Sequence, residues 1–209
     1  MWVIKIGGSL LGSVELPHLL ALIAMYGNGQ VVIVPGGGVF AEAVRDAQRQ
    51  TNISDAAAHQ LAILAMDQFG HLLAAMSLNL VTASSELEIS EYSSQHKGII
   101  WLPSKMTLAE ADIPQNWQLT SDSLSAWLAN KLGAQQLVLV KSKSLSTYEK
   151  STSVKTLIED ELVDSEFPAI AVGKSYSSWV LNKADYAVFD SGFHEEKLTK
   201  KAKLIKMLS

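Results

Sequence analysis

Trp2-Val3-Ile4-Lys5-Ile6-Gly7-Gly8-Ser9 opens the chain with a short apolar run that stops at two glycines. An apolar run of this length that ends in glycine is typical of a buried strand followed by a tight turn. The pattern repeats at residues 30–34, which are followed by Pro35-Gly36-Gly37-Gly38. Helical periodicity follows each turn, over residues 15–26 and 39–50. The first 50 residues therefore predict a β-α-β-α unit with a glycine turn after each strand.

The rest of the chain continues the alternation of strands and helices. Ser54 and Asp55 are favoured helix caps, and a long helical stretch follows them to about Asn79. Residues 169–181 fit either a strand or a helix, and residues 142–153 are polar enough for a loop. The further expected strands are 98–102, 136–140 and 186–189, and the further expected helices are 107–111, 120–132, 154–162 and 195–208.

Continuous apolar strands between helices are typical of parallel sheets that are covered on both faces. We therefore expect a three-layer α/β/α sandwich with a mostly parallel sheet. No repeat, long linker or low-complexity tract divides the sequence. Residues 1–209 are accordingly expected to form a single domain.

The composition excludes several classes of protein. The 209 residues are 48% apolar and 18% charged with a formal charge of −4, which is typical of a folded globular chain. The absence of cysteine rules out disulfides, a thiolate nucleophile and cysteine-ligated metal sites. Arg45 and Arg49 are the only arginines, so no nucleic-acid surface is expected, and no apolar run is long enough for a membrane span. We expect a cytoplasmic protein.

The two glycine turns form the first candidate binding site. They follow successive strands, at the edge of an open α/β sheet where ligands bind. Without Cβ atoms, Gly7, Gly8 and residues 36–38 let the backbone approach a ligand closely, and amides at the following helix can donate to phosphate. Strand-to-helix turns also use glycine for purely structural reasons. Lys5 favours the ligand interpretation, because a lysine inside an apolar strand needs an anionic partner.

The second turn also satisfies the dinucleotide pattern Gly36-x-Gly38-x-x-Ala41. A dinucleotide enzyme would continue into a strand that ends in an acidic residue about 20 residues later. This chain continues into a helix at Asp55 instead, and neither turn carries the lysine of a phosphate-binding loop. A Rossmann dehydrogenase is therefore disfavoured.

Three further polar residues are candidates for the same site. Asp122 stands at a predicted helix start, where it either caps the helix or orients Lys5. Arg45 lies on the helix after the triple glycine and either faces solvent or grips a substrate phosphate. His59 lies on the long helix, either as a core histidine or as a substrate contact. Because the histidines lack metal-ligand spacing, no protein metal site is expected.

Three motifs occur in order and span most of the chain: Lys5-Ile6-Gly7-Gly8-Ser9, Pro35-Gly36-Gly37-Gly38 and Thr120-Ser121-Asp122-Ser123-Leu124. Together they resemble the amino acid kinase superfamily, which includes acetylglutamate, uridylate and isopentenyl phosphate kinases. The segment that begins Ser54-Asp55-Ala56-Ala57-Ala58-His59 is similar to a branch that phosphorylates (5-(aminomethyl)furan-3-yl)methyl phosphate in methanofuran-type cofactor synthesis. The resemblance implies ATP-dependent phosphoryl transfer to a small phosphorylated acceptor.

The resemblance also implies roles for individual residues. Lys5 would contact the transferring phosphoryl group, and Asp122 would orient lysines. The remaining expected contacts are Gly7, Gly8 and Ser9 with ATP phosphates, Lys141 and Lys143 as further cations there, and Gly36, Gly37, Gly38, Arg45 and His59 with the acceptor. An acceptor that is already a phosphate needs no strong base, and Mg²⁺ would bridge ATP phosphates without a protein cage.

One segment departs from the family pattern. Many members carry Val-Asp-Gly near the nucleotide base, after the strand that corresponds to residues 137–140, whereas this chain has Lys141-Ser142-Lys143-Ser144. Two alternatives therefore stay open. One is a catalytically inactive protein that binds a nucleotide or phosphometabolite, and the other is a sibling kinase for another phosphate or carboxylate. A homo-oligomer is also expected, since the apolar helix at residues 61–76 can supply a dimer face as well as a core.

Overall fold

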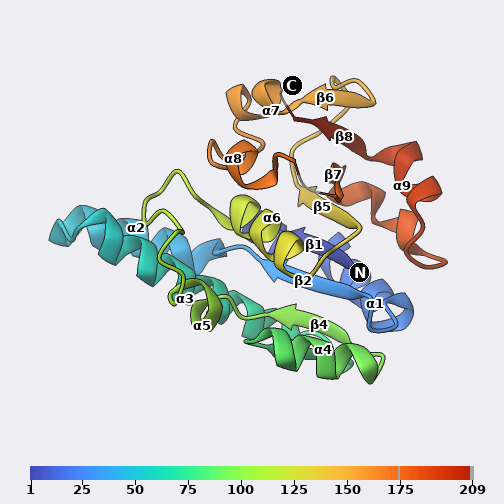
Figure 1. The fold of residues 1–209 in the computed structure, drawn as a ribbon, viewed down its shortest axis with the longest axis horizontal. Helices are drawn as coiled ribbons and strands as arrows, with labels where there is room; N and C mark the ends of the chain where they lie inside the picture. Colours follow the sequence, from blue (N-terminus) through green and yellow to red (C-terminus); the bar gives the residue numbers. More distant parts are fainter. Residues whose placement is uncertain (174, 208–209) are drawn as a thin grey trace.

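One eight-stranded sheet runs through the computed structural model, which describes residues 1–173 and 175–207 (Figure 1). The strand order is β3-β4-β2-β1-β5-β7-β8-β6. Within the described residues every pair of neighbouring strands is parallel except β7 and β8. The strands are β1 (Trp2–Ile6), β2 (Val31–Pro35), β3 (Leu80–Ala83), β4 (Gly98–Trp101), β5 (Gln136–Lys141), β6 (Ser151–Ser153), β7 (Ser177–Asn182) and β8 (Lys203–Lys206).

Helices cover both faces of this sheet, which confirms the expected layered architecture and the mostly parallel strands. The α-helices are α1 (Glu15–Tyr26), α2 (Gly38–Thr51), α3 (Asp55–Ala75), α4 (Glu86–Ser94), α5 (Ser104–Thr107), α6 (Ser121–Lys131), α7 (Val154–Glu159), α8 (Phe167–Ala171) and α9 (Glu195–Lys201). Two 3-10 helices, η1 (Gly8–Leu10) and η2 (Lys183–Phe189), complete the described elements. None of the described helices combines the length and the apolar character that a membrane span requires.

Alternation along the central strand β1 assigns its side chains to two cores. Successive side chains of a strand point to opposite faces of the sheet. Ile4 and Ile6 therefore pack in the core that contains the apolar side of α1, whereas Val3 packs in the core that contains Leu124 and Leu128 of α6. Lys5 alternates with Ile4 and Ile6, so it points to the α6 face.

The long helix ends earlier than the sequence indicated. Helix α3 stops at Ala75 rather than near Asn79, and a turn closed by the Leu80 amide donating to the Ser77 carbonyl leads into β3. Strand β3 then pairs with β4 along four residues, and that pairing outweighs the continued apolar periodicity. The expected short helix at 107–111 lies earlier, at Ser104–Thr107, where the Thr107 hydroxyl donates to the Pro103 carbonyl.

The carboxyl-terminal region differs most from the sequence expectation. Residues 186–189, expected as a strand, belong to η2, and the strand is β7, which begins in the ambiguous segment 169–181 and ends one residue after it. The expected helix 195–208 stops at Lys201, and the chain turns back as β8, antiparallel to β7. Residue 208 lies outside the described residues. The expected loop at 142–153 contains β6, which pairs with β8, so sheet pairing decided β6, β7 and β8.

Candidate active site

Two lysines from neighbouring strands point to the same face of the sheet. Lys5 lies on β1, and Lys141 ends β5 two residues after Leu139, which packs in the core under α6. Strands β1 and β5 are paired in parallel with Lys5 beside Leu139, so the two lysines extend from the same edge region. Alternation along the strands therefore brings together two cations that lie 136 residues apart in the sequence.

 The ammonium groups of Lys5 and Lys141 meet at the start of α6.

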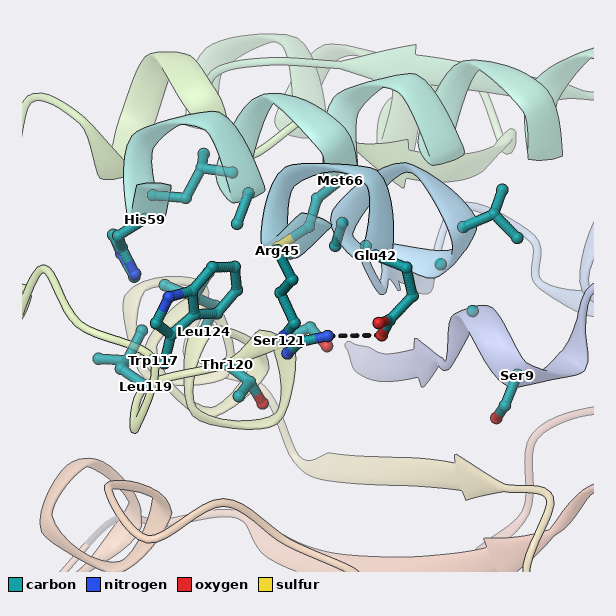
Figure 2. A pocket seen from close by; sticks show the side chains of 17 residues that line it. Ser9, Glu42, Arg45, His59, Met66, Trp117, Leu119, Thr120, Ser121 and Leu124 are labelled. Atoms are coloured by element: carbon teal, nitrogen blue, oxygen red, sulfur yellow. Dashed lines mark hydrogen bonds and ion pairs between the residues drawn. The ribbon is translucent and has the colours of Figure 1, made fainter. Parts of the chain in front are cut away.

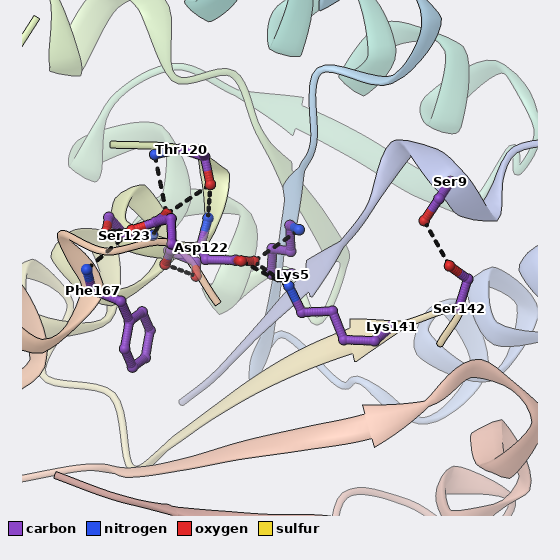
Figure 3. Close-up of polar contacts among 10 residues, drawn as sticks. Lys5, Ser9, Thr120, Asp122, Ser123, Lys141, Ser142 and Phe167 are labelled. Atoms are coloured by element: carbon purple, nitrogen blue, oxygen red, sulfur yellow. Dashed lines mark hydrogen bonds and ion pairs between the residues drawn. The ribbon is translucent and has the colours of Figure 1, made fainter. Parts of the chain in front are cut away.

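Asp122, in the first turn of α6, lies between the two ammonium groups (Figure 3). Its Oδ1 is 2.8 Å from the Nζ of Lys5, and its Oδ2 is 2.7 Å from the Nζ of Lys141. Thr120 caps the helix by accepting from the Asp122 amide, which fixes the backbone beneath this carboxylate. The interpretation of Asp122 as a residue that orients Lys5 therefore agrees with the observed contact.

This cluster is buried and carries more positive than negative charge. Lys5 and Asp122 are 7% and 5% exposed. Burial alone would raise the pKa of Asp122, but Lys141 and Lys5 outweigh it and bring that pKa to about 2. Burial and, to a smaller extent, the nearby charge of Lys5 lower the pKa of Lys141 to about 8, although Asp122 opposes the change. Two ammonium groups then share one carboxylate at neutral pH, so the cluster is suited to bind an anion.

A second carboxylate, Asp164, holds the start of α6 from behind. Its Oδ2 accepts from the amide and hydroxyl of Thr120, at 3.0 and 2.6 Å, and from the Ser123 amide at 3.0 Å. Its Oδ1 accepts from the Ser123 hydroxyl and from the Phe167 amide. Thr120 and Ser123 flank Asp122, so Asp164 positions the residue that holds both lysines. The sequence interpretation missed Asp164, because its loop lies more than 40 residues from the motif it supports.

The two glycine turns lie against each other at the carboxyl ends of β1 and β2. A Cβ atom on Gly8 would be 2.0 Å from the Cα of Gly38, so this approach requires glycine. Gly38 itself has a φ of +55°, in the left-handed region where a side chain is strained. Gly36 donates its amide to the Ile6 carbonyl and lines neither cavity described below. The glycines at 8, 36 and 38 therefore also have a structural role, which is one of the two interpretations of these turns given above.

Two cavities meet at the first glycine turn. The smaller, of about 240 Å³, is lined by the lysine cluster and the end of β5. The larger, of about 410 Å³, lies between α2, α3 and the segment before α6. Gly8 and Ser9 line both cavities. The two cavities therefore adjoin each other at this turn.

The smaller cavity contains the expected residues Lys5, Gly7, Gly8, Ser9, Lys141 and Lys143. The Ser142 hydroxyl donates to the Ser9 hydroxyl at 3.1 Å and ties the first turn to the end of β5. The Nζ of Lys143 donates to the Asp160 carbonyl at 2.8 Å and lies at an exposed edge. Lys143 therefore stands apart from the buried pair formed by Lys5 and Lys141.

The larger cavity is mostly apolar and contains Gly37, Gly38, Arg45 and His59 from the sequence interpretation. Its walls are Gly8, Ser9, Gly37, Gly38, Val39, Ala41, Glu42, Arg45, His59, Ala62, Ile63, Met66, Trp117, Leu119, Thr120, Ser121 and Leu124. Arg45 pairs with Glu42 at 2.6 Å and lies 4.5 Å from the ring centroid of Trp117. Figure 2 shows His59, Trp117 and Leu119 toward one end of this pocket and Ser9 toward the other. Trp117 was missed, because a lone tryptophan in a polar segment carries no periodic signal.

Asp122 has no carboxylate oxygen left for a protein-bound metal ion. Both oxygens of Asp122 are engaged by lysines. Within residues 1–173 and 175–207, no group of three or more histidine, aspartate or glutamate side chains is arranged to hold a metal ion. Glu161 lines the smaller cavity, so its carboxylate, bound phosphates and water are the oxygen ligands within reach of a divalent cation there.

A layered α/β fold with a buried lysine pair at two glycine turns defines an enzyme class that handles phosphate groups. Residues 1–145 match the model of the amino acid kinase family. The chain therefore belongs to the amino acid kinase family, as the three sequence motifs indicated, and it is a kinase.

The comparisons also give a particular relative. The chain is 31% identical, over 196 residues, to the (5-(aminomethyl)furan-3-yl)methyl phosphate kinase of Methanocaldococcus jannaschii, covering 87% of this chain and 88% of that protein. Two solved structures share the fold at 15% identity. The uridylate kinase of Archaeoglobus fulgidus has a TM-score of 0.70 and covers 98% of this chain and 99% of its own. The UMP kinase of Ureaplasma parvum has a TM-score of 0.68 and covers 98% of each chain.

Proposed function

We propose that this kinase transfers the γ-phosphoryl group of ATP to (5-(aminomethyl)furan-3-yl)methyl phosphate and forms the corresponding diphosphate. The relative from Methanocaldococcus jannaschii, which carries this activity in its name, supports the choice of acceptor. The observation that carries the proposal is the meeting of two cavities at Gly8 and Ser9, beside a buried cluster with surplus positive charge. Transfer of a phosphoryl group between two bound phosphates needs this arrangement.

The donor phosphates bind in the smaller cavity in this proposal. The amides of Gly7, Gly8 and Ser9 donate to their oxygens, and the ammonium groups of Lys5 and Lys141 neutralise charge on the transferring group. Lys143, at the exposed edge, adds a weaker attraction for the nucleotide. Lys5 and Asp122 are the residues we assign to catalysis, with Asp122 acting through the lysines that it positions.

The acceptor needs no general base. A phosphate monoester has its second pKa near 6, so its oxygen is already ionised at neutral pH. That oxygen attacks the γ-phosphorus, the new P–O bond forms, and the bond from the γ-phosphorus to the bridging oxygen of ADP breaks. Catalysis then consists of positioning and charge neutralisation, which Lys5 and Lys141 can supply. Asp122 stays ionised throughout, in keeping with its pKa of about 2.

Mg²⁺ accompanies the nucleotide in this proposal. When bound, it would reduce the negative charge on the phosphate oxygens. The chain supplies no free carboxylate for it at Asp122, because both carboxylate oxygens are bound by lysines.

The acceptor occupies the larger cavity with its phosphate toward Gly8, Gly37 and Gly38. The start of α2, at Gly37 and Gly38, lines this end of the cavity, and the start of a helix favours an anion. Arg45 lies along the same cavity, where its pairing with Glu42 leaves the far side of the guanidinium stacked on Trp117. The apolar remainder of the walls suits a small ring between the phosphate and the far end.

The test is a direct assay of the purified protein with ATP, Mg²⁺ and the furan phosphate. We expect ADP release together with a new diphosphate signal in ³¹P NMR. Uridine monophosphate and aspartate, the acceptors of kinases with this fold, serve as comparison substrates. Faster turnover of another acceptor would favour a sibling kinase, and nucleotide binding without ADP formation from any acceptor would favour an inactive binding protein.

We also propose that the chain forms a homo-oligomer. Helix α3 buries Ile63, Met66 and Phe69, yet Leu61 and Leu64 on the same helix remain 41% and 43% exposed. Exposed apolar side chains on one helix are suited to a subunit contact. Light scattering of the wild type and of a Leu61→Glu, Leu64→Glu double variant tests this, with dissociation of the variant expected and a monomeric wild type as the contrary result.

A further inference from the structure

His59 is a buried histidine whose two ring nitrogens have different surroundings. The side chain lies on α3 and is 3% exposed. Its Nδ1 is 2.9 Å from the Asn116 carbonyl oxygen. Because a carbonyl can only accept, Nδ1 carries the hydrogen and donates it. Burial lowers the pKa of His59, with the bond to Asn116 opposing, so the ring is neutral and its Nε2 presents a lone pair.

That lone pair has no partner among the described residues. The Nε2 atom is buried and lacks a hydrogen bond. Of the buried side-chain nitrogens and oxygens without partners in the described ranges, it is the one that belongs to a residue lining the larger cavity. A buried acceptor without a donor is costly, so a ligand that supplies a donor gains more than a single exposed contact would give.

The polar groups near His59 are already engaged. The indole nitrogen of Trp117 donates to the Gln48 side-chain oxygen at 2.7 Å. The guanidinium of Arg45 is held by Glu42 and lies over the Trp117 ring. The neighbouring walls at Ile63 and Met66 are apolar. The cavity end at His59 therefore offers one acceptor in an apolar, aromatic setting.

This end is remote from the phosphate-binding turns. Figure 2 shows His59 and Trp117 toward one end of the cavity, Ser9 toward the other, and Arg45 and Glu42 between them. A ligand that fills the cavity with its phosphate at Gly8 would bring its opposite end toward His59. The group at that opposite end must donate a hydrogen bond.

We propose that the Nε2 atom of His59 accepts a hydrogen bond from a primary amine at the end of the acceptor opposite its phosphate, and so selects aminated phosphate esters. This inference rests on the proposed function and narrows its substrate class. The aminomethyl group of the proposed acceptor is a donor of the required kind, and an ammonium group beside the Trp117 ring is also favoured electrostatically. Asn116 is a positioning residue, because its carbonyl fixes the tautomer of His59.

The experiment compares the aminomethyl furan phosphate with the analogue that carries a methyl group in place of the aminomethyl group. The wild type should show a kcat/KM about 10- to 100-fold higher for the amine, as expected for one charge-assisted hydrogen bond. His59→Leu should reduce that ratio at least about tenfold, because it lowers kcat/KM for the amine more than kcat/KM for the methyl analogue. His59→Gln, whose side-chain oxygen can also accept, should recover part of the preference.

The matched control is His71→Leu, which changes an exposed histidine on the same helix and should leave the ratio unchanged. A ratio in His59→Leu equal to that of the wild type would overturn the inference while leaving the kinase assignment intact. Calorimetry with the same two phosphates separates the two proposals if neither is phosphorylated. Loss of amine preference on binding in His59→Leu, with partial recovery in His59→Gln, would support the role of His59, and equal wild-type affinity for the two compounds would overturn it.

Discussion

The buried charges around Asp122 and the buried histidine at the far end of the acceptor pocket differ in how completely the protein satisfies them. Asp122 has a lysine on each carboxylate oxygen, and Asp164 accepts hydrogen bonds that hold both sides of the helix start. His59 has one engaged nitrogen and, among the described residues, one without a partner.

From this difference we infer that the Asp122 cluster acts in phosphoryl transfer and that His59 acts in the choice of acceptor. A fully paired cluster is rigid, so Lys5 and Lys141 are held in place before any substrate arrives. A pocket whose acceptor is left open gains its last hydrogen bond only from a suitable ligand. We therefore expect changes in the cluster to affect turnover of every acceptor, and changes at His59 to affect the choice between acceptors.

Replacing Lys5 tests the first half of this comparison and has the largest expected effect. Lys5→Met keeps much of the side-chain length but removes the charge, and we expect kcat to fall by about 10² to 10³ for every acceptor. Lys155→Met, at an exposed lysine on α7, is the control. Retention of more than about a tenth of the wild-type rate would remove Lys5 from the chemistry.

Replacing Asp122 tests whether the pairing also stabilises the fold. Asp122→Asn leaves the buried ammonium group of Lys5 and the largely buried one of Lys141 without their counter-ion, and loss of one partner of a buried pair costs about 3–5 kcal/mol. The pKa of Asp122 is lowered from 3.8 to about 2, so its stabilising effect is present above the ordinary value and disappears as the pH falls through about 2.

Chemical denaturation measures this free energy of unfolding. Asp46→Asn, which breaks an exposed ion pair with Arg49, is the control and should change the stability little. Equal stability of the wild type and Asp122→Asn would show that the cluster does not depend on its carboxylate.

The pH dependence distinguishes a charged Lys141 from a merely structural one. Since burial lowers the pKa of Lys141 to about 8, its ammonium group loses its proton above that pH, and kcat/KM should fall about tenfold between pH 8 and pH 9.5. The stability change has the opposite sign, because the unfolded lysine binds its proton more tightly and stability rises between about pH 8 and 10.5. Lys141→Arg stays charged and should move the alkaline decline to higher pH; an unchanged profile would exclude Lys141 as its source.

Asp164 gives the smallest expected effect. Asp164→Asn keeps the shape but removes the negative charge that supports the amides and hydroxyls of Thr120 and Ser123, so we expect a modest fall in kcat. The nearby charge of Asp164 raises the pKa of Lys141, so its loss should move the alkaline decline of kcat/KM to lower pH. A change in stability with no shift of the pH profile would restrict Asp164 to a structural role.

The sequence by itself determined the two glycine turns, the central parallel strands and the order of the three motifs. These features are local, since an apolar run that ends in glycine is stabilised largely by its own burial and turn chemistry. The same local information indicated Lys5, because a lysine inside a buried strand is out of place without a partner. The partial failures were β3 and β8, where pairing with other strands decided the conformation, and η2, where the sequence indicated a strand.

Only the tertiary structure decided which charges meet. Lys141 points toward Asp122 because β5 lies beside β1 with the same alternation, and Asp164 reaches Thr120 from a loop that follows α7. The tautomer of His59 depends on the backbone carbonyl of Asn116, which is 57 residues away in the sequence. Hydrogen bonds and ion pairs between distant segments are set by strand order and helix packing, and a sequence pattern records neither the partner nor its distance.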